Sequence, residues 1–145
     1  MPVSGVFAFF SNALNLQRIT PPELCFRILT PTPIKMGQET RIDYRLRLYG
    51  IPFRWSTLIS LWDPPRRFVD VQIRGPYKQW VHTHDFIGRS DGTEMVDKVV
   101  YRLPLWPLGE AFHPLIRRQL SMIFLFREKK IRKIFEDRDL LLRLK

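Results

Sequence analysis

The sequence is poor in the features that build disulfide frameworks and membrane spans. Among 145 residues it has one cysteine, Cys25, which excludes an intrachain disulfide and a cysteine-based zinc site. We expect Cys25 to be a small core residue. The longest uninterrupted apolar run, residues 122–126, is far too short to cross a bilayer as a helix. The first residues lack the regions of a signal peptide, so we expect a cytoplasmic protein.

Negative charge is scarce relative to positive charge. The chain has 24 Lys and Arg against 14 Asp and Glu, a formal net charge of +10. Such a balance is typical of proteins that touch nucleic acid or an anionic membrane, although basic residues also simply solvate outer faces. No nucleic-acid-binding motif is present, so nucleic acid is not an expected partner. The basic residues of positions 117–133 could make a weak contact with an anionic membrane.

The apolar pattern changes twice along the chain. Residues 3–14 have the spacing of a short helix. From residue 110 to residue 136 apolar side chains recur every three or four positions, which predicts one long amphipathic helix. Alternating apolar and polar residues between them predict strands over residues 24–29, 40–48, 53–61, 68–74, 79–87 and 94–103.

This order of elements indicates an α+β fold. A single antiparallel sheet has one apolar face, and the long C-terminal helix is the only element large enough to cover it. We therefore expect one domain over residues 1–136, with a curved sheet wrapped around that helix, and a tail over residues 137–145. Such a curl leaves a space between sheet and helix, which is a natural ligand pocket.

Two histidines lie on one face of the strand predicted over residues 79–87. Residues two apart on a strand share a face, so His82 and His84 point the same way as Trp80 and Phe86. A four-residue hairpin loop over residues 89–92 would place His84 opposite Asp97 on the next strand. We therefore expect Asp97 to pair with His84 inside the pocket.

Three chemistries fit these side chains. A zinc site usually has three or four ligands, and His82, His84 and Asp97 make a thin set, so no metal or cofactor is expected. General acid–base work by Asp97, His84 and Tyr101 remains open, because no signature demands or excludes it. The third is a buried polar network inside an apolar cavity, which would also orient a ligand.

A family resemblance is carried by several strings along most of the chain. They are Trp80, His82, His84 and Phe86 at alternate positions, the later Asp97 and Tyr101, and residues 6–10, 68–72 and 75–77. With these strings the chain resembles the SRPBCC superfamily, and within it a bacterial ligand-binding branch. The helix-grip fold of that superfamily is shared by START lipid-transfer domains, plant pathogenesis-related allergens and polyketide cyclases.

The resemblance implies two further features of the fold. Relatives begin with a strand before the first helix, whereas this chain starts almost at that helix. A sheet without that strand has an exposed edge, which favours a homodimer. The resemblance also implies that Phe68, Asp70 and Gln72 face inward, where simple periodicity prefers the residues at 69, 71 and 73.

The sequence therefore predicts non-catalytic binding or carriage of a hydrophobic small molecule or lipid between the sheet and the C-terminal helix. The alternatives are a cyclase- or hydrolase-type enzyme that uses Asp97 and His84 as acid and base, and an accessory module of a reductase- or epimerase-like partner protein, which the resemblance implies. The predicted ligand-binding residues are Tyr44, Leu46, Trp55, Trp80, His82, His84, Phe86, Asp97, Tyr101, Leu120, Ile123 and Phe124.

Overall fold

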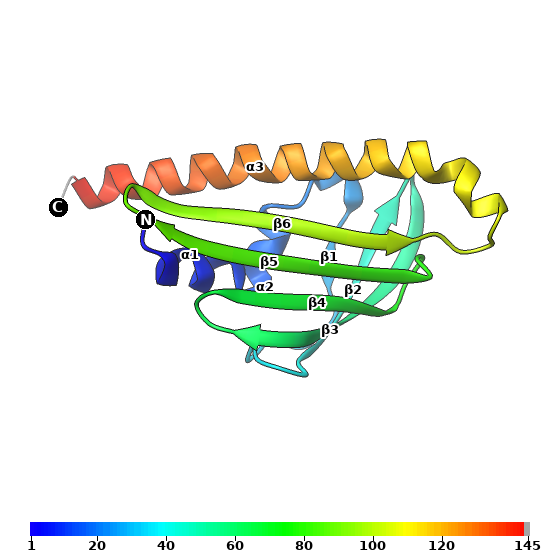
Figure 1. Ribbon diagram of the computed structural model, residues 1–145, viewed down its shortest axis with the longest axis horizontal. Helices are drawn as coiled ribbons and strands as arrows, with labels where there is room; N and C mark the ends of the chain where they lie inside the picture. The colour runs from blue at the N-terminus through cyan, green and yellow to red at the C-terminus, as the bar shows by residue number, and fades with distance from the viewer. Residues whose placement is uncertain (144–145) are drawn as a thin grey trace.

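The computed structural model describes the backbone of residues 1–143 and the side chains of residues 1–136. Short helices begin the chain and one long helix ends it (Figure 1). Asn12 caps the second helix, because its side chain accepts a hydrogen bond from the backbone N–H of Leu14 at 3.0 Å. The helical elements are α1 (Val3–Phe10), α2 (Ala13–Arg18), the 3-10 turns η1 (Pro22–Leu24) and η2 (Leu108–Phe112), and α3 (His113–Arg143).

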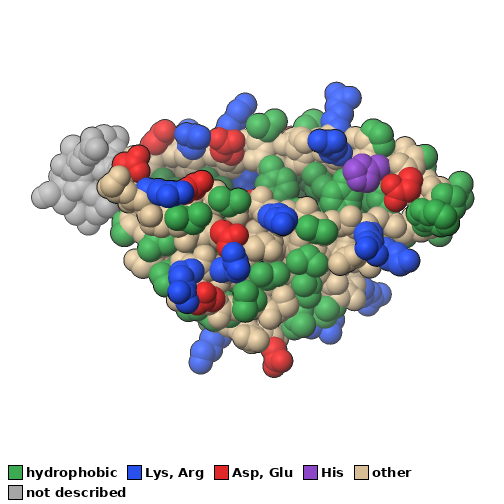
Figure 2. Space-filling view, in the orientation of Figure 1, with side chains coloured by type: hydrophobic (Ala, Val, Ile, Leu, Met, Phe, Trp, Pro, Cys, Tyr) green, Lys and Arg blue, Asp and Glu red, His purple; other side chains and the backbone are tan. Residues whose placement is uncertain are grey.

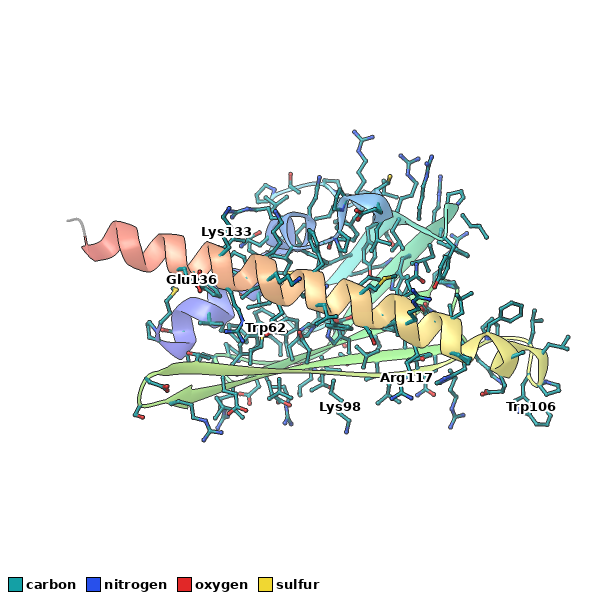
Figure 3. The ribbon with its side chains drawn as sticks, turned by 90° about the horizontal axis from the view of Figure 1, so that it is seen from above. Trp62, Lys98, Trp106, Arg117, Lys133 and Glu136 are labelled. Carbon is teal, nitrogen blue, oxygen red and sulfur yellow. The ribbon has the colours of Figure 1, made fainter. Side chains whose placement is uncertain are left out.

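The chain between η1 and η2 forms a six-stranded sheet, whose strands follow one another in chain order and whose neighbouring pairs are all antiparallel. The sheet curves, and α3 runs along it (Figures 1 and 3). The α+β helix-grip fold expected from the sequence is therefore confirmed. The strands are β1 (Arg27–Ile28), β2 (Arg41–Leu48), β3 (Ile51–Asp63), β4 (Arg67–Arg74), β5 (Gln79–Arg89) and β6 (Gly92–Arg102).

The hairpin of β5 and β6 has the predicted register. Gly88 lies opposite Thr93, and His84 lies opposite Asp97. The turn is tighter than predicted, because residues 89 and 92 still pair and only residues 90–91 remain outside the ladder. The side chains that approach each other across this hairpin are therefore those that the alternation of the sequence indicated.

The facing of β4 follows the resemblance and not the simple periodicity. Phe68 is buried and pairs with His84, whereas Ile73 is 50 % exposed. A bulge on the neighbouring strand β3 also shifts its alternation, because Ile59 and Leu61 pair with consecutive residues of β4. Strict alternation along residues 53–61 would turn Leu61 inward with Ile59, but Leu61 is exposed and Trp62 packs against the core.

Three local expectations need correction. The first strand is a two-residue edge, and Cys25, expected in the core, is exposed on the turn before it. The long helix begins at His113 and not at residue 110, because Pro114 lacks an N–H and is tolerated only in the first turn of a helix. Helix α3 then continues to Arg143, through most of the predicted tail, and residues 144–145 lie outside the described residues.

No strand is formed by residues 1–2, which precede α1, so the outer edge of β6 is unpaired in the described sheet. The N-terminus instead lies at the β5–β6 turn, where the Thr93 hydroxyl donates a hydrogen bond of 2.9 Å to the carbonyl of Met1 (Figure 1). This contact places α1 under one end of the sheet.

The surface carries scattered charge and one apolar end. On the face shown in Figure 2, Lys and Arg side chains are spread among acidic and apolar ones. The large apolar side chains of highest exposure are Leu105, Trp106 and Leu108, at 78, 78 and 73 %, beside η2. Trp106 lies at the tip of this segment, away from the sheet (Figure 3). Among the described helices, none is both long enough and apolar enough to cross a membrane.

Apolar side chains pack in two clusters on the inner face of the sheet. One contains Val6, Phe7, Ile59, Phe68 and Phe86, and the other Leu46, Trp55 and Tyr77. The Phe7 ring meets the rings of Trp62, Phe68 and Phe86 edge-on, at centroid distances of 5.2, 5.9 and 5.3 Å. Helix α1 thus closes one end of the space between sheet and α3.

Replacing Phe7 by alanine should lower the free energy of unfolding by about 3–5 kcal/mol, because the ring is buried and its loss leaves a cavity. The matched deletion Phe112→Ala removes a ring that is 59 % exposed and should cost within about 0.5 kcal/mol. Urea unfolding followed by tryptophan fluorescence measures both. If Phe7→Ala does not fold, Phe7→Leu should fold with a smaller loss; equal costs for Phe7→Ala and Phe112→Ala would contradict this core.

Candidate functional site

A cavity of about 170 Å³ lies between the inner face of the sheet, the N-terminal helices and α3. Helix α3 lines it with side chains at i, i+3, i+4 and i+7, which is one face of a helix. The cavity brings together most of the side chains predicted for the site. Those that line it are Tyr44, Leu46, Trp55, Trp80, His82, His84, Leu120, Ile123 and Phe124.

The three other predicted residues lie behind this lining. Phe86 belongs to the core cluster around Phe7 and is 3 % exposed. Asp97 contacts the cavity only through the two histidines. Tyr101 packs on Tyr77 and stacks on His113 at a centroid distance of 5.4 Å. Their ligand-binding roles remain predictions, and they would act on a ligand only through the residues that line the cavity.

The lining also contains residues that the sequence did not single out. Asp70 and Arg127 add two charged groups of opposite sign, one from β4 and one from α3. The inward facing of Asp70 followed from the resemblance alone. The segment of α2 and the turn after it contributes Asn15, Leu16 and Ile19, for which no local pattern gave a signal.

Aromatic rings form one end of the wall. The Trp55 indole meets Trp80 edge-on at 5.2 Å and Tyr77 at 5.5 Å, and its other side stacks on Tyr44 at 6.0 Å. Such contacts hold the rings in fixed orientations. The Nε1 atom of Trp55 is buried and has no hydrogen-bond partner in the described chain.

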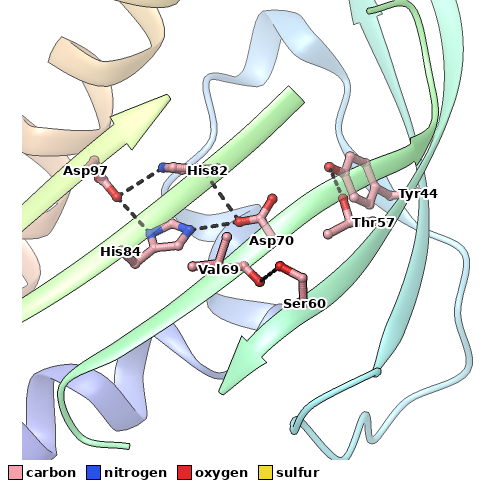
Figure 4. A network of polar contacts seen from close by, with 8 residues as sticks. All are labelled: Tyr44, Thr57, Ser60, Val69, Asp70, His82, His84 and Asp97. Atoms are coloured by element: carbon pink, nitrogen blue, oxygen red, sulfur yellow. Dashed lines mark hydrogen bonds and ion pairs between the residues drawn. The ribbon is translucent and has the colours of Figure 1, made fainter. Parts of the chain in front are cut away.

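Two aspartates and two histidines form a closed ring of contacts at the middle of the wall (Figure 4). Nε2 of His84 donates to Oδ2 of Asp70 at 2.9 Å, and Nε2 of His82 donates to Oδ1 of Asp97 at 3.1 Å. Nδ1 of His84 lies 2.7 Å from Oδ1 of Asp97, at an angle too bent for a full hydrogen bond. Nδ1 of His82 lies 3.6 Å from Oδ2 of Asp70. Every imidazole nitrogen of the ring therefore faces a carboxylate.

Burial and pairing set the protonation of this ring. Burial alone would raise the pKa of Asp97 and of Asp70, but the neighbouring histidines outweigh it and hold the pKa of both below its usual range. Burial and the nearby His84 lower the pKa of His82. For His84, burial also lowers the pKa, but the contacts with Asp70 and Asp97 outweigh it and leave the pKa raised. Of the two imidazoles, His84 is therefore the one that is protonated more readily.

The same side chains are of the types that ligate metals. Asp70, His82 and His84 each offer one ligand atom, and the three atoms lie within 4.8 Å of one another. Sequence analysis counted His82, His84 and Asp97 and expected no metal site. The structure replaces Asp97 in that set by Asp70, which lines the cavity.

A second polar group lies on the other side of Asp70. The hydroxyls of Tyr44 and Thr57 share a hydrogen bond of 3.1 Å, and burial, with the charge of Asp70, raises the pKa of the Tyr44 phenol. Arg127 reaches the cavity from α3, with its guanidinium 5.3 Å from the centre of the Phe124 ring and its buried Nε without a partner in the described chain. The phenol thus stays neutral, and Arg127 offers the cavity a positive charge.

No protein-family model matches this sequence, and no curated protein matches it significantly. Solved structures do resemble it. Protein TTHA0849 from Thermus thermophilus has a TM-score of 0.72 at 18 % identity, over 91 % of this chain and 88 % of that one. Protein Ms6760 from Mycobacterium smegmatis has a TM-score of 0.65 at 14 % identity, over 94 and 85 %.

A Bet v 1-like protein is among these neighbours. Ara h 8.0201 has a TM-score of 0.62 at 14 % identity, over 92 % of this chain and 91 % of that chain. Identities this low establish the fold alone. The chain has a helix-grip fold of the Bet v 1 type.

Because the pKa of Asp97 is lowered on folding, its ionised form adds stability that is fully present above the usual aspartate value of about 3.9, and this stability is lost progressively as the pH falls below that value toward the lowered pKa of the folded state. Asp97→Asn should therefore lower the free energy of unfolding by about 3 kcal/mol at pH 7. The difference in unfolding free energy between Asp97→Asn and the unmodified protein should become smaller below about pH 4.

Urea unfolding between pH 7 and pH 3, with EDTA present so that only protons vary, measures this gap. The control is Asp91→Asn, which changes an exposed carboxylate in the β5–β6 turn and should leave the unfolding free energy within about 0.5 kcal/mol throughout. A gap for Asp97→Asn that stays constant over this pH range would show that Asp97 is not ionised in the folded ring.

Proposed function

We propose that this protein binds a compact, mainly apolar small molecule between the sheet and α3, without transforming it. The observation that carries the proposal is the cavity itself, whose wall is aromatic and aliphatic apart from a few convergent polar groups. Such a composition is typical of small-molecule sites, where apolar burial supplies affinity and a few polar contacts fix orientation. The helix-grip neighbours support a ligand-binding fold and name no ligand for this chain.

The volume limits the size of the molecule. An engineered protein cavity of about 150 Å³ holds benzene, whereas sites for drug-sized ligands span roughly 300–1,000 Å³. At about 170 Å³ the cavity suits a ligand of one or two rings or a short chain. A membrane lipid would fit only if α3 or the N-terminal helices moved apart. We therefore favour a small molecule over a whole lipid.

The charge of Arg127 indicates what the ligand carries. This residue brings a guanidinium group to the lining of the cavity. A ligand with an anionic or hydrogen-bond-accepting group would pair with it. The aromatic end of the wall around Trp80 would then hold its apolar part.

Acid–base catalysis by the Asp97 and His84 pair is less well supported by this geometry. A general base must reach the proton that it abstracts, within hydrogen-bond distance of the substrate. Both nitrogens of His84 face carboxylates, Asp70 on one side and Asp97 on the other. In the metal-free ring both nitrogens of this imidazole are engaged by carboxylates, so a binding role agrees better with this geometry.

Replacing Trp80 by alanine should weaken binding of the two-ring fluorescent probe 6-hydroxynaphthalene-2-sulfonate about tenfold, because the change removes part of the apolar wall. Trp106→Ala, which removes an indole that is 78 % exposed at the end of the molecule, should leave the affinity unchanged. Probe fluorescence titrations of both variants give the dissociation constants. Loss of binding in Trp106→Ala alone would place the probe on the surface and contradict a cavity site.

Native mass spectrometry of the freshly purified protein, beside its denatured mass, tests whether a ligand is carried. We expect an added organic mass that denaturation removes. Exchange of that mass for an added probe, in the unmodified protein and less readily in Trp80→Ala, would locate it in the cavity. A bare mass together with no probe binding would overturn the proposal.

A further inference from the structure

The ring of Asp70, His82, His84 and Asp97 has an arrangement that binding an apolar molecule does not require. We propose that Asp70, His82 and His84 bind a divalent first-row metal ion at the wall of the cavity, and that Asp97 holds both imidazoles in place from behind. This inference goes beyond the proposed function and does not depend on it.

The three ligand atoms converge on one point. Oδ2 of Asp70 lies 2.9 Å from Nε2 of His84 and 3.6 Å from Nδ1 of His82. In a tetrahedral site with metal–ligand bonds of about 2.0–2.1 Å, neighbouring ligand atoms are about 3.3 Å apart. The two observed distances bracket that value, and all three atoms lie within 4.8 Å of one another. The imidazole centroids lie 3.8 Å apart, so the two rings would rotate apart when both bind one metal ion.

The nitrogens on the far side of both imidazoles meet a single carboxylate. Oδ1 of Asp97 lies 3.1 Å from Nε2 of His82 and 2.7 Å from Nδ1 of His84. Histidines that ligate a metal almost always give their other N–H to a carboxylate, a carbonyl or water, which fixes the tautomer and orients the ring. Here one aspartate faces both histidines, with a hydrogen bond to His82 and a bent contact to His84. Metal binding would displace the proton that Nε2 of His84 now shares with Asp70.

The backbone holds these four side chains rigidly. His82 and His84 lie on one face of β5. Asp70 on the neighbouring strand β4 lies opposite His82, and Asp97 on β6 lies opposite His84. The neighbouring rings also restrict the imidazoles: Phe68 stacks on His84 at 4.1 Å, and Phe124 meets His82 edge-on at 5.7 Å. Binding sites on the central strands of a sheet, locked by packing, are preorganised for a ligand.

The charge of the cluster matches a dication. Asp70 and Asp97 are the carboxylates that face the two imidazoles, and both imidazoles are buried, each 6 % exposed. With neutral histidines, the two negative charges balance one divalent cation. The basic group that faces the cluster across the cavity is Arg127, whose charge acts on Asp70. With the metal ion balanced by the two aspartates, Arg127 adds one positive charge on the cavity side of the site.

The open side of the site faces the cavity. Asp70, His82 and His84 line it, whereas Asp97 does not. A three-ligand site of this kind keeps a coordination position for water or for a donor atom of a bound molecule. The oxygen or nitrogen donor of a cavity ligand, or an anion attracted by Arg127, would occupy that position.

Two imidazoles and one carboxylate select among metals. This set is used for zinc in hydrolytic sites and for iron(II) in the facial triad, whereas softer ions prefer thiolates. Cys25, the single thiol, is exposed and is not part of the cavity lining. We therefore take Zn²⁺ as the probe ion and Co²⁺ as its spectroscopic substitute.

The test uses the full chain without a histidine tag, treated with EDTA and then dialysed. Zn²⁺ is titrated against a chromophoric chelator, and one equivalent should bind. His84→Ala should weaken Zn²⁺ binding at least a hundredfold. Asp97→Asn should keep the stoichiometry and weaken it about ten- to a hundredfold, the usual effect of losing an outer-shell partner.

Two matched controls separate this site from adventitious binding at the surface. His113→Ala removes the remaining histidine, which stacks on Tyr101 away from the ring, and Cys25→Ser removes the exposed thiol. Neither should change the affinity. Circular dichroism checks that each variant is folded.

A measurement on the unmodified protein keeps the proposal testable if His84→Ala fails to fold. The Co²⁺ form should show visible absorption bands of a four- or five-coordinate site, and Zn²⁺ X-ray absorption should report two imidazoles. Absence of a saturable one-equivalent site in the unmodified protein would overturn the proposal. So would binding that disappears in His113→Ala or Cys25→Ser and persists in a folded His84→Ala.

Failure here and failure of the proposed function are distinguishable. The metal-free protein should still bind 6-hydroxynaphthalene-2-sulfonate if the cavity takes an apolar molecule. Probe binding without Zn²⁺ binding would overturn only the metal site. Zn²⁺ binding without probe binding would overturn only the apolar cavity function.

Discussion

Burying two carboxylates inside an apolar wall is the constraint on which the middle of this protein depends. An ionised carboxylate taken out of water is costly unless it is paired and hydrogen-bonded. Asp70 and Asp97 come from strands on either side of β5, so only side chains on that strand can reach both. His82 and His84 fill this role from alternate positions. The inward facing of alternate residues on β5 is thus needed to pair the buried carboxylates of β4 and β6. These contacts also fix the register of the three strands.

Sequence reasoning found this part of the structure where polarity alternates cleanly. On β6 the charged residues at positions 94, 98 and 102 mark the outer face, so Asp97 could be placed inward and opposite His84. The same reasoning failed on β4, because the outward residues 69, 71 and 73 are all apolar and periodicity alone cannot tell the core face from an apolar outer face. The bulge on β3, which moves Trp62 inward, likewise leaves no mark in the local pattern.

The cavity shows why the remaining site residues were beyond prediction. Ile19 and Arg127 lie more than a hundred positions apart, and they share a wall only because α2 and α3 meet the same face of the sheet. Side chains that would otherwise pack against each other line the cavity instead, and such a gap in the packing agrees with a role in binding.

The two-residue turn between β5 and β6 has a consequence for how the chain can vary in length. One inserted or deleted residue within either strand would reverse the facing of every side chain beyond it, and would separate the histidines from Asp97. The turn at residues 90–91 is outside the ladder, so added residues there leave the pairing of His84 with Asp97 intact. Homologous chains that keep the ring should therefore differ in length at this turn and at the other loops, and hold a fixed count of residues between His84 and the turn and between the turn and Asp97.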